Sequence, residues 1–397
     1  MDLTLTERER SFQAECREFM QAGVPRERAP YDEDGAWVEQ SKQWQRTLAA
    51  GRWAVPGWPS RFGGRDATPV ELMLYEHELA AVHPPRAINV IGTGWAGAAL
   101  LRHGTPSQQE RYLPPIPAAD EVWCQLFSEP DAGSDLAALQ TRATLTPDGQ
   151  SYVVEGQKIW SSIAQVADRG ILLARTDATA RKHHGISCFV LDMHAPGITV
   201  RPITQITGER DFNEVFFDGV RIPASDRIAA EGEGWTVAIT TLMAERVGLS
   251  AGEGTLWGSG PTFADVLRLW QRRKDASALP RGAEGVALRD EVARLHVEGE
   301  ALRLTGLRLL SDVARGGLPA AQMSVRKLAS DVWGQAVHEA VWRMLGPQAL
   351  VSRGDPDAVD DAGWQRAYLF ARALTIGGGT TEVQKDILAR RILGLPV

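Results

Sequence analysis

The spacing of hydrophobic residues changes twice along the chain. Near the start, Phe12, Cys16 and Phe19 recur at the interval of an amphipathic helix, directly after a capping box formed by Thr6 and Glu9. Further helices are predicted over residues 71–81 and 106–112. The first third of the chain is therefore predicted to be helical.

From about residue 121 the pattern becomes that of short strands. β-branched and aromatic residues concentrate in short runs, and turn residues such as Pro147-Asp148-Gly149 separate them. Strands are predicted over residues 122–127, 142–145, 152–155, 171–176, 186–192, 198–202 and 214–217.

After Gly234 the helical spacing returns. Helices are predicted over residues 235–250, 288–313, 319–345, 364–374 and 382–393. Between the first two, residues 252–285 combine Gly, Ser and Pro with a basic cluster. We predict that this segment is irregular, either a loop or a surface for a partner, and its Trp257 has no predicted role.

The order of these elements predicts an α+β protein. Helices and strands are segregated along the chain, whereas a doubly wound nucleotide-binding fold would alternate them. No Gly-x-Gly-x-x-Gly follows a strand, which argues against a Rossmann site. We predict an N-terminal helical domain over residues 1–120, an antiparallel β-barrel or sandwich domain over 121–231, and a C-terminal helical bundle over 232–397.

Charge and cysteine content exclude several classes of protein. The 43 basic and 50 acidic residues give a net charge of −7, and the scattered basic residues do not form a nucleic-acid surface. Cys16, Cys124 and Cys188 have neither disulfide-framework nor metal-ligand spacing. The longest uncharged stretch, residues 87–101, is too short to span a bilayer. No signal peptide is evident. We expect a soluble, cytoplasmic protein without a metal, nucleic-acid or membrane partner.

Two polar segments in the predicted β domain can carry chemistry. The run from Phe127 to Asp135 offers the Ser128 and Ser134 hydroxyls and loop amides to a phosphate or heterocycle, although it can also be a plain polar turn. In the second segment, Trp160 can stack on a flat ring while Ser162 bonds its edge. A tryptophan that fills the core at a strand end is the alternative.

Two further segments lie in the last 160 or so residues. Glu245, next to Arg246 in the predicted helix 235–250, can serve as a general base or be part of a solvated charge pair. Gly377-Gly378-Gly379-Thr380 precedes a helix, whose backbone N–H groups can bind a phosphate or another anion. Alternatively it is a glycine turn with Thr380 as the N-cap.

In this order, the four segments resemble the acyl-CoA dehydrogenase family over nearly the whole chain. The match also includes Gly57-Trp58-Pro59, Phe62-Gly63-Gly64, residues 212–220 and the closing Leu393-Gly394-Leu395-Pro396. The resemblance implies the family's fold with a C-terminal four-helix bundle, an FAD cofactor and an acyl-CoA substrate. It implies dehydrogenation to a 2-enoyl-CoA, electron transfer to an electron-transferring flavoprotein, and a homodimer or homotetramer.

The same resemblance implies individual roles. The residues that match FAD contacts are Phe127, Ser128, Ser134, Trp160, Ser162, Thr380 and Glu382. Those that match acyl-CoA contacts are Arg246, Ser134 and Gly378. Among the flavin contacts, Ser128 matches a donor to the pyrimidine edge and Trp160 a stacking ring.

Several departures from the family pattern shape these expectations. Many members carry their catalytic Glu where this chain has Gly378, so the base is assigned to Glu245, as in isovaleryl-CoA dehydrogenase-like members. Gly378 leaves room for a branched or bulky acyl group. The Arg-x-x-Phe-Gly segment, an FAD contact across a dimer interface, is absent, and residues 345–348 replace the usual Gln-x-x-Gly-Gly-x-Gly.

Similar departures occur in a subgroup from actinobacterial lipid and steroid metabolism, some of whose members pair as unlike subunits. Two alternatives therefore stay open. One is an acyl-CoA oxidase or flavin monooxygenase on the same fold, and the other is a non-catalytic subunit of a heteromeric acyl-CoA dehydrogenase.

Overall fold

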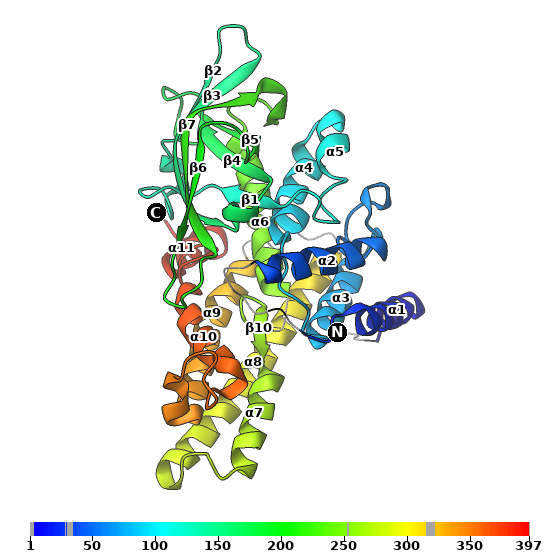
Figure 1. Ribbon diagram of the computed structural model, residues 1–397, viewed down its shortest axis with the longest axis vertical. Coiled ribbons are helices and arrows are strands. Elements are labelled where there is room, and N and C mark those ends of the chain that lie inside the picture. The colour runs from blue at the N-terminus through cyan, green and yellow to red at the C-terminus, as the bar shows by residue number, and fades with distance from the viewer. Residues whose placement is uncertain (1–3, 28, 30–34, 252–253, 315–321, 397) are drawn as a thin grey trace. The chain divides into compact units, whose positions relative to one another are not determined.

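The computed structural model describes residues 4–27, 29, 35–251, 254–314 and 322–396. It forms two compact units, which we call unit 1 (residues 1–68 and 82–245) and unit 2 (residues 69–81 and 246–397). Figure 1 shows their helices and strands coloured in chain order. The predicted helical, β and helical regions follow one another as expected, which confirms the α+β fold. The three domain boundaries stay a prediction.

Unit 1 contains the N-terminal helices and the sheet. Its helices are α1 (Glu7–Gly23), α2 (Ala36–Ala50), α4 (Gly97–His103), α5 (Pro106–Tyr112) and the start of α6 (Gly234–Ala251). Its strands are β1 (Trp123–Leu126), β2 (Arg142–Leu145), β3 (Ser151–Ser162), β4 (Arg169–Arg175), β5 (Ile186–Asp192), β6 (Ile198–Ile203), β7 (Phe212–Pro223) and β8 (Arg227–Ile228). The predicted capping box of Thr6 and Glu9 begins α1.

The described strands of unit 1 form one sheet in the order β6-β7-β3-β2-β4-β5-β8, with β1 beside β4. Most neighbours are antiparallel, but β1 and β4 run parallel, and β2 meets β4 in a parallel bridge. The predicted antiparallel β domain thus also contains parallel pairing, between β1 and β4 and between β2 and β4. Parallel pairing requires a long crossover, and the chain from β1 to β4 supplies one because β2 and β3 lie within it.

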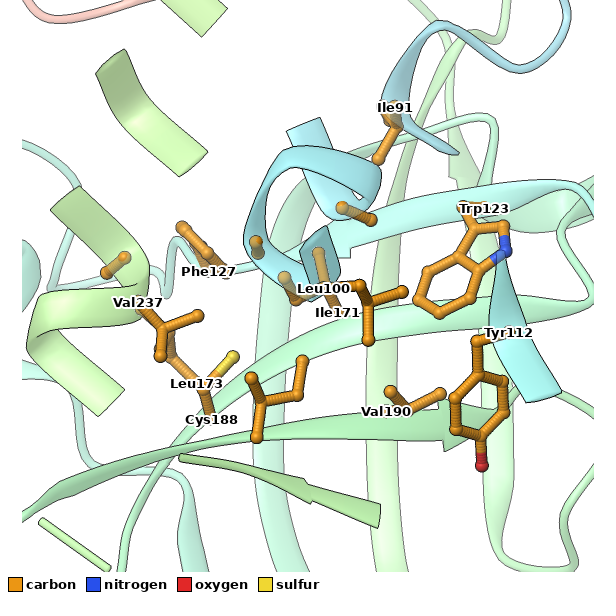
Figure 2. Close-up of a cluster of buried hydrophobic side chains, with 14 of the residues drawn as sticks. Ile91, Leu100, Tyr112, Trp123, Phe127, Ile171, Leu173, Cys188, Val190 and Val237 are labelled. Atoms are coloured by element: carbon orange, nitrogen blue, oxygen red, sulfur yellow. The ribbon is translucent and has the colours of Figure 1, made fainter. Parts of the chain in front are cut away.

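Both faces of the sheet are buried, because alternate residues of the central strands enter different clusters. Ile171 and Leu173 of β4 belong to the first cluster, whereas Leu172 and Ala174 belong to the second. In the first cluster, strand residues meet helical ones, as Figure 2 shows for Leu100, Tyr112, Ile171, Leu173, Val190 and Val237. The start of α6 is thereby held against the sheet.

Unit 2 is mostly helical. Its elements are α3 (Pro69–Ala81), β9 (Gly254–Leu256), β10 (Ser259–Thr262), α7 (Phe263–Asp275), α8 (Gly282–Ala314), α9 (Gln322–Leu345), α10 (Gly363–Phe370) and α11 (Thr381–Arg391). Leu288 and Leu295 of α8 pack with Val337 and Val341 of α9 in its core. In the described ranges, no helix is long and apolar enough to cross a membrane.

The prediction that residues 252–285 are irregular is wrong for most of the described part. Residues 254–262 form the β9–β10 hairpin, and α7 follows it. The helix begins with a capping box in which Thr262 accepts from the Asp265 N–H, and it buries Val266 and Leu269. The Gly and Pro residues of the hairpin hid this signal. Residues 252 and 253 lie outside the described residues.

A buried histidine in unit 2 predicts a pH-dependent stability. Thr255 Oγ1 donates to Pro261 O at 2.8 Å, so it accepts from His338 Nε2, also at 2.8 Å. Burial and the nearby Arg372 lower the pKa of His338 to about 4. In the unfolded chain a histidine has a pKa of about 6.5. The unfolded state therefore binds more protons than the folded state between these two values.

The free energy of unfolding should consequently fall as the pH drops from about 6.5 towards about 4. His338→Gln should remove this part of the pH dependence. Equilibrium denaturation of both proteins at about pH 7 and about pH 5 measures it. A stability difference between wild type and variant that is equal at the two pH values would contradict the prediction.

Candidate active site

The end of strand β3 carries one extra residue relative to its partner β7. Lys158 pairs with Val215 and Ser161 pairs with Asn213, so three steps along β3 match two along β7. The extra residue makes a β-bulge, a feature that re-aims side chains and is frequent next to active sites. Trp160 lies within this bulge.

The bulge turns the indole of Trp160 outward. Its φ of 60° is unusual for a residue with a bulky side chain, and 57% of the residue is exposed. One edge contacts the ring of Phe212, at 6.1 Å between centroids and 80° between planes. The alternative of a tryptophan filling the core is therefore wrong. Strained backbone of this kind persists where the surroundings hold it, often at functional sites.

A buried ion pair holds the segment after β1 against β3. Lys158 is fully buried, and its Nζ lies 2.8 Å from Glu129 Oε1 and donates to Phe127 O at 3.0 Å. Glu129 also accepts from the N–H groups of Gln140 (2.6 Å) and Thr141 (2.9 Å). Every one of these contacts fixes the backbone around residue 128.

Both members of this pair are charged near neutral pH. Burial opposes ionisation of Glu129, but Lys158 and the hydrogen bonds from Thr141 and Gln140 outweigh it and keep the pKa of Glu129 below its ordinary value. Burial lowers the pKa of Lys158 to about 8, despite the attraction of Glu129. The pair is thus a fixed charged clamp inside unit 1.

The clamp brings Ser128 and Trp160 to the same place. Ile159 N donates to Ser128 O at 2.9 Å, so Ser128 is bonded to the residue directly before Trp160. Both Ser128 and Ser162 are half-buried. An exposed indole, next in the chain to the residue that bonds Ser128, suits a flat heterocycle with a polar edge.

Phe127 and Ser134 lie differently from this group. The ring of Phe127 is only 3% exposed and points into the core next to Leu100 and Val237 (Figure 2). A contact through Phe127 would therefore use its backbone. Ser134 is exposed, and the following Asp135 pairs with Lys182.

Glu245 lies on α6 and is half-buried. The helix before it is well anchored in unit 1, because Val237 is buried and Thr240 Oγ1 bonds His103 Nε2 of α4 at 2.8 Å. The side chain of Arg246 lies outside the described part of the chain. Glu245 is the last residue of unit 1, whereas Gly378, Thr380 and Glu382 belong to unit 2.

In unit 2, the predicted glycine loop precedes α11. Gly378 and Gly379 have φ values of +65° and +91°, which favour glycine. Thr380 caps the helix, since its Oγ1 accepts from Val383 N at 3.2 Å. Gln384 Nε2 donates back to Gly378 O at 3.0 Å. The loop therefore has a defined shape at the positive end of the helix dipole.

The packing around this loop also explains why it contains glycines. A Cβ on Gly379 would lie 2.6 Å from Gln384 Nε2. Gly378 cannot act as a base, and it can contact a ligand only through its backbone. Glu382 is exposed in the first turn of α11. A glycine loop that opens onto a helix N-terminus suits a phosphate or another polar group.

Sequence reasoning did not single out three residues that shape these sites, namely Glu129, Lys158 and Gln384. A signal for Lys158 was present, because it is in phase with the inward-facing Tyr152 and Val154 of β3. A lysine at such a position requires a buried partner. The described residues hold no group of three or more His, Cys, Asp and Glu side chains placed to bind a metal ion.

Models of known protein domains match almost the whole chain. Models of the N-terminal, middle and C-terminal domains of acyl-CoA dehydrogenase match residues 6–120, 124–220 and 232–393. The acyl-CoA dehydrogenase IpdE1 of Mycobacterium tuberculosis is 36% identical over 90% of this chain and 89% of its own length.

Solved structures are similar over the full length. The Tcur3481-Tcur3483 steroid ACAD superposes with a TM-score of 0.83 at 28% identity, covering 100% of both chains. The ChsE4-ChsE5 complex from Mycobacterium tuberculosis gives a TM-score of 0.82 at 27% identity, again with 100% of both chains covered.

Proposed function

The chain belongs to the acyl-CoA dehydrogenase family, and on that premise we propose that it uses FAD to convert an acyl-CoA thioester into a 2-enoyl-CoA, with Glu245 as the base. A flavin and an acyl-CoA substrate follow from the family. The assignment of Glu245, the choice of FAD and the transfer of electrons to an electron-transferring flavoprotein are the proposal.

The chemistry assigns Glu245 one task. A proton on the α-carbon of a thioester is weakly acidic, so its removal needs a positioned carboxylate and donors for the charge that develops on the carbonyl oxygen. Glu245 takes the α-proton, and the electron pair left behind forms the new double bond. The flavin, when bound, accepts the β-hydrogen as hydride. Gly378 has no carboxylate to share this role.

The observation that carries the proposal is the exposed, bulged indole of Trp160 beside Ser128. The residue is 57% exposed, and its positive φ is a strained conformation of the kind that clusters at functional sites. The Lys158–Glu129 clamp supports the same interpretation, because it fixes the backbone that carries Ser128. In unit 2, Thr380 and Glu382 are proposed to contact polar parts of FAD, and the backbone of Gly378 to contact the substrate.

Trp160→Ala should weaken FAD binding about five- to tenfold, because stacking on an aromatic ring contributes on the order of 1–1.5 kcal/mol. Trp160→Phe keeps a ring and should lie between wild type and Ala. Flavin titration of the apoprotein gives the dissociation constants. The control is Ile206→Ala, which also removes an exposed apolar side chain from unit 1. A Trp160→Ala dissociation constant within twofold of wild type would refute stacking at this position.

The substrate class can be narrowed further. Gly378 lacks the side chain that many family members place there, and one similar structure is described as a steroid ACAD. We infer a branched or ring-bearing acyl group. Anaerobic mixing with straight, branched and ring-bearing acyl-CoAs tests both substrate and reaction, since turnover bleaches the visible absorption of the flavin. Bleaching by straight-chain substrates alone would contradict the inference, and bleaching by none would contradict the reaction.

A second candidate function is supported by the similar solved structures, two of which carry paired chain names. The ChsE4-ChsE5 structure is a complex of two differently named chains, so this chain is a candidate subunit of a heteromer instead of the predicted homodimer or homotetramer. Purified alone, a non-catalytic subunit would be colourless and inactive. Flavin-containing, active protein of one chain type supports the primary proposal. Rapid reoxidation of the reduced enzyme by oxygen would instead indicate the oxidase alternative.

A further inference from the structure

Trp257, the tryptophan without a predicted role, lies at the turn of the β9–β10 hairpin. Its backbone has a positive φ of 51°. The indole Nε1 donates to Leu374 O at 3.4 Å, and the ring meets Phe370 edge-on at 5.7 Å between centroids. The hairpin thereby reaches the segment that leads into the glycine loop, all within unit 2.

The ring of Trp257 also takes the space beside the first glycine of that loop. A Cβ on Gly377 would lie 2.6 Å from Trp257 Cη2, closer than real contacts allow. Gly377 has no positive φ to require glycine. The contact with Trp257 is therefore the reason that this position has no side chain.

A buried ion pair on α9 holds the same carbonyl. Lys327 and Asp331 are 2% and 1% exposed, and Lys327 Nζ lies 2.6 Å from Asp331 Oδ2. The same Nζ donates to Leu374 O at 3.2 Å. Leu374 O thus receives a charged donor from α9 and an indole donor from the hairpin. On the adjacent turn, Gln335 Nε2 donates to Ala371 O at 3.0 Å.

These contacts hold the loop on one side, while Gln384 holds it on the other. Gln384 bonds Gly378 O, so the Leu374 and Gly378 carbonyls are both fixed by side chains from outside the loop. Between these two carbonyls the chain is rich in glycine, which permits many backbone conformations. Burying an ion pair is costly in solvation and is a poor way to gain stability alone. Its position on this carbonyl indicates a positioning role.

We propose that Trp257, Lys327 and Asp331 are positioning residues, which hold Leu374 O and thereby aim the backbone N–H groups of the glycine loop and of the start of α11 at their ligand. The inference rests on the proposed function, in which this loop contacts FAD and substrate. A displacement of about 1 Å in such donors can cost about 100-fold in rate.

The first test removes the indole donor together with the Cη2 edge that lies beside Gly377. Trp257→Phe keeps a ring in place and should weaken FAD binding about three- to tenfold, the effect of one lost hydrogen bond. FAD titration of the full-length apoprotein measures this, and thermal unfolding without FAD is recorded in parallel. Trp342→Phe is the matched control, because Trp342 packs on Tyr368 in the same unit at 4.3 Å. A merely structural role would lower the apoprotein melting temperature and leave the FAD dissociation constant unchanged.

The second test removes the ion pair. Lys327→Met alone leaves Asp331 buried without its cation, so the double variant Lys327→Met/Asp331→Leu is used to keep the core apolar. It should raise the FAD dissociation constant about tenfold or more and lower kcat more than it raises KM. Arg294→Met is the control, since it breaks the exposed Arg294–Glu298 pair on α8.

The third test examines coupling between the ring and the loop. Gly377→Ala should weaken FAD binding, and the added Trp257→Leu should partly restore it because it clears the 2.6 Å contact. If wild type binds FAD and the Trp257, Lys327/Asp331 and Gly377 variants all bind it within twofold of their controls, the positioning inference is wrong. If wild-type protein itself binds no flavin, the proposed function fails instead.

Discussion

Glu245→Gln is expected to slow reduction of the flavin by acyl-CoA about 100- to 10,000-fold, the range that positioned general bases contribute. The amide has nearly the shape of the carboxylate but cannot accept the α-proton. FAD and acyl-CoA binding should stay within about twofold of wild type, since the amide keeps the size and shape of the side chain. Anaerobic stopped-flow absorbance measures the rate, and titration measures both affinities.

Glu110→Gln serves as the matched control for this prediction. Glu110 is an exposed glutamate on α5 of the same unit, and its variant should bleach at the wild-type rate. Bleaching by Glu245→Gln at an undiminished rate would remove Glu245 from the mechanism. Loss of FAD from the variant would show that the residue shapes the site instead of acting in it.

Lys158→Met is expected to lower the free energy of unfolding of the apoprotein by about 3–5 kcal/mol, because it leaves the carboxylate of Glu129 buried without a cation. The Phe127 carbonyl loses a donor at the same time. The segment that carries Ser128 should loosen, so FAD binding should weaken as well. Equilibrium chemical denaturation followed by circular dichroism gives the first quantity, and FAD titration the second.

Two further variants test whether the loss of stability comes from leaving a buried charge without its partner. Lys158→Met/Glu129→Gln removes both charges and should recover part of the lost stability, since no charge stays buried without a partner and the amide oxygen still accepts from one of the two N–H groups, of Thr141 or of Gln140. Arg142→Met breaks the exposed Arg142–Glu155 pair, whose side chains are 68% and 60% exposed, and should cost less than about 1 kcal/mol. Equal losses in Lys158→Met and Arg142→Met would contradict the buried clamp.

The fold was predictable because its elements carry long, regular patterns. The strands of the β region alternate, and α8 and α9 have extended apolar stripes, so their order and type could be inferred from spacing alone. The stretch from residue 254 to 275 was missed for the opposite reason. Its hairpin is short, and its packing depends on Trp257 meeting Leu374, more than 100 residues away. Local patterns do not encode such a contact.

The candidate site was predictable in part. The residues of the family segments could be named, and the structure brings Ser128 and Trp160 together in unit 1. Of the residues that hold them in place, Glu129 could not be named because its role depends on burial, whereas the inward phase of Lys158 on β3 was a signal for it. Residues of these types are usually exposed, and only the folded structure shows the buried contacts of Lys158, Glu129 and Gln384.

The extra residue in β3 also divides the strand into two halves of opposite parity. Before it, even-numbered residues such as Tyr152, Val154 and Lys158 face inward; after it, the odd-numbered Ser161 does. Removing one residue here would leave the positions of Lys158 and Ser161 two steps apart, which matches the two steps from Val215 to Asn213. In that regular ladder both side chains would still face inward, with Ser161 opposite Asn213, which now donates to its carbonyl at 2.9 Å. A deletion would remove the bulge itself, and with it the backbone conformation that turns the indole of Trp160 outward.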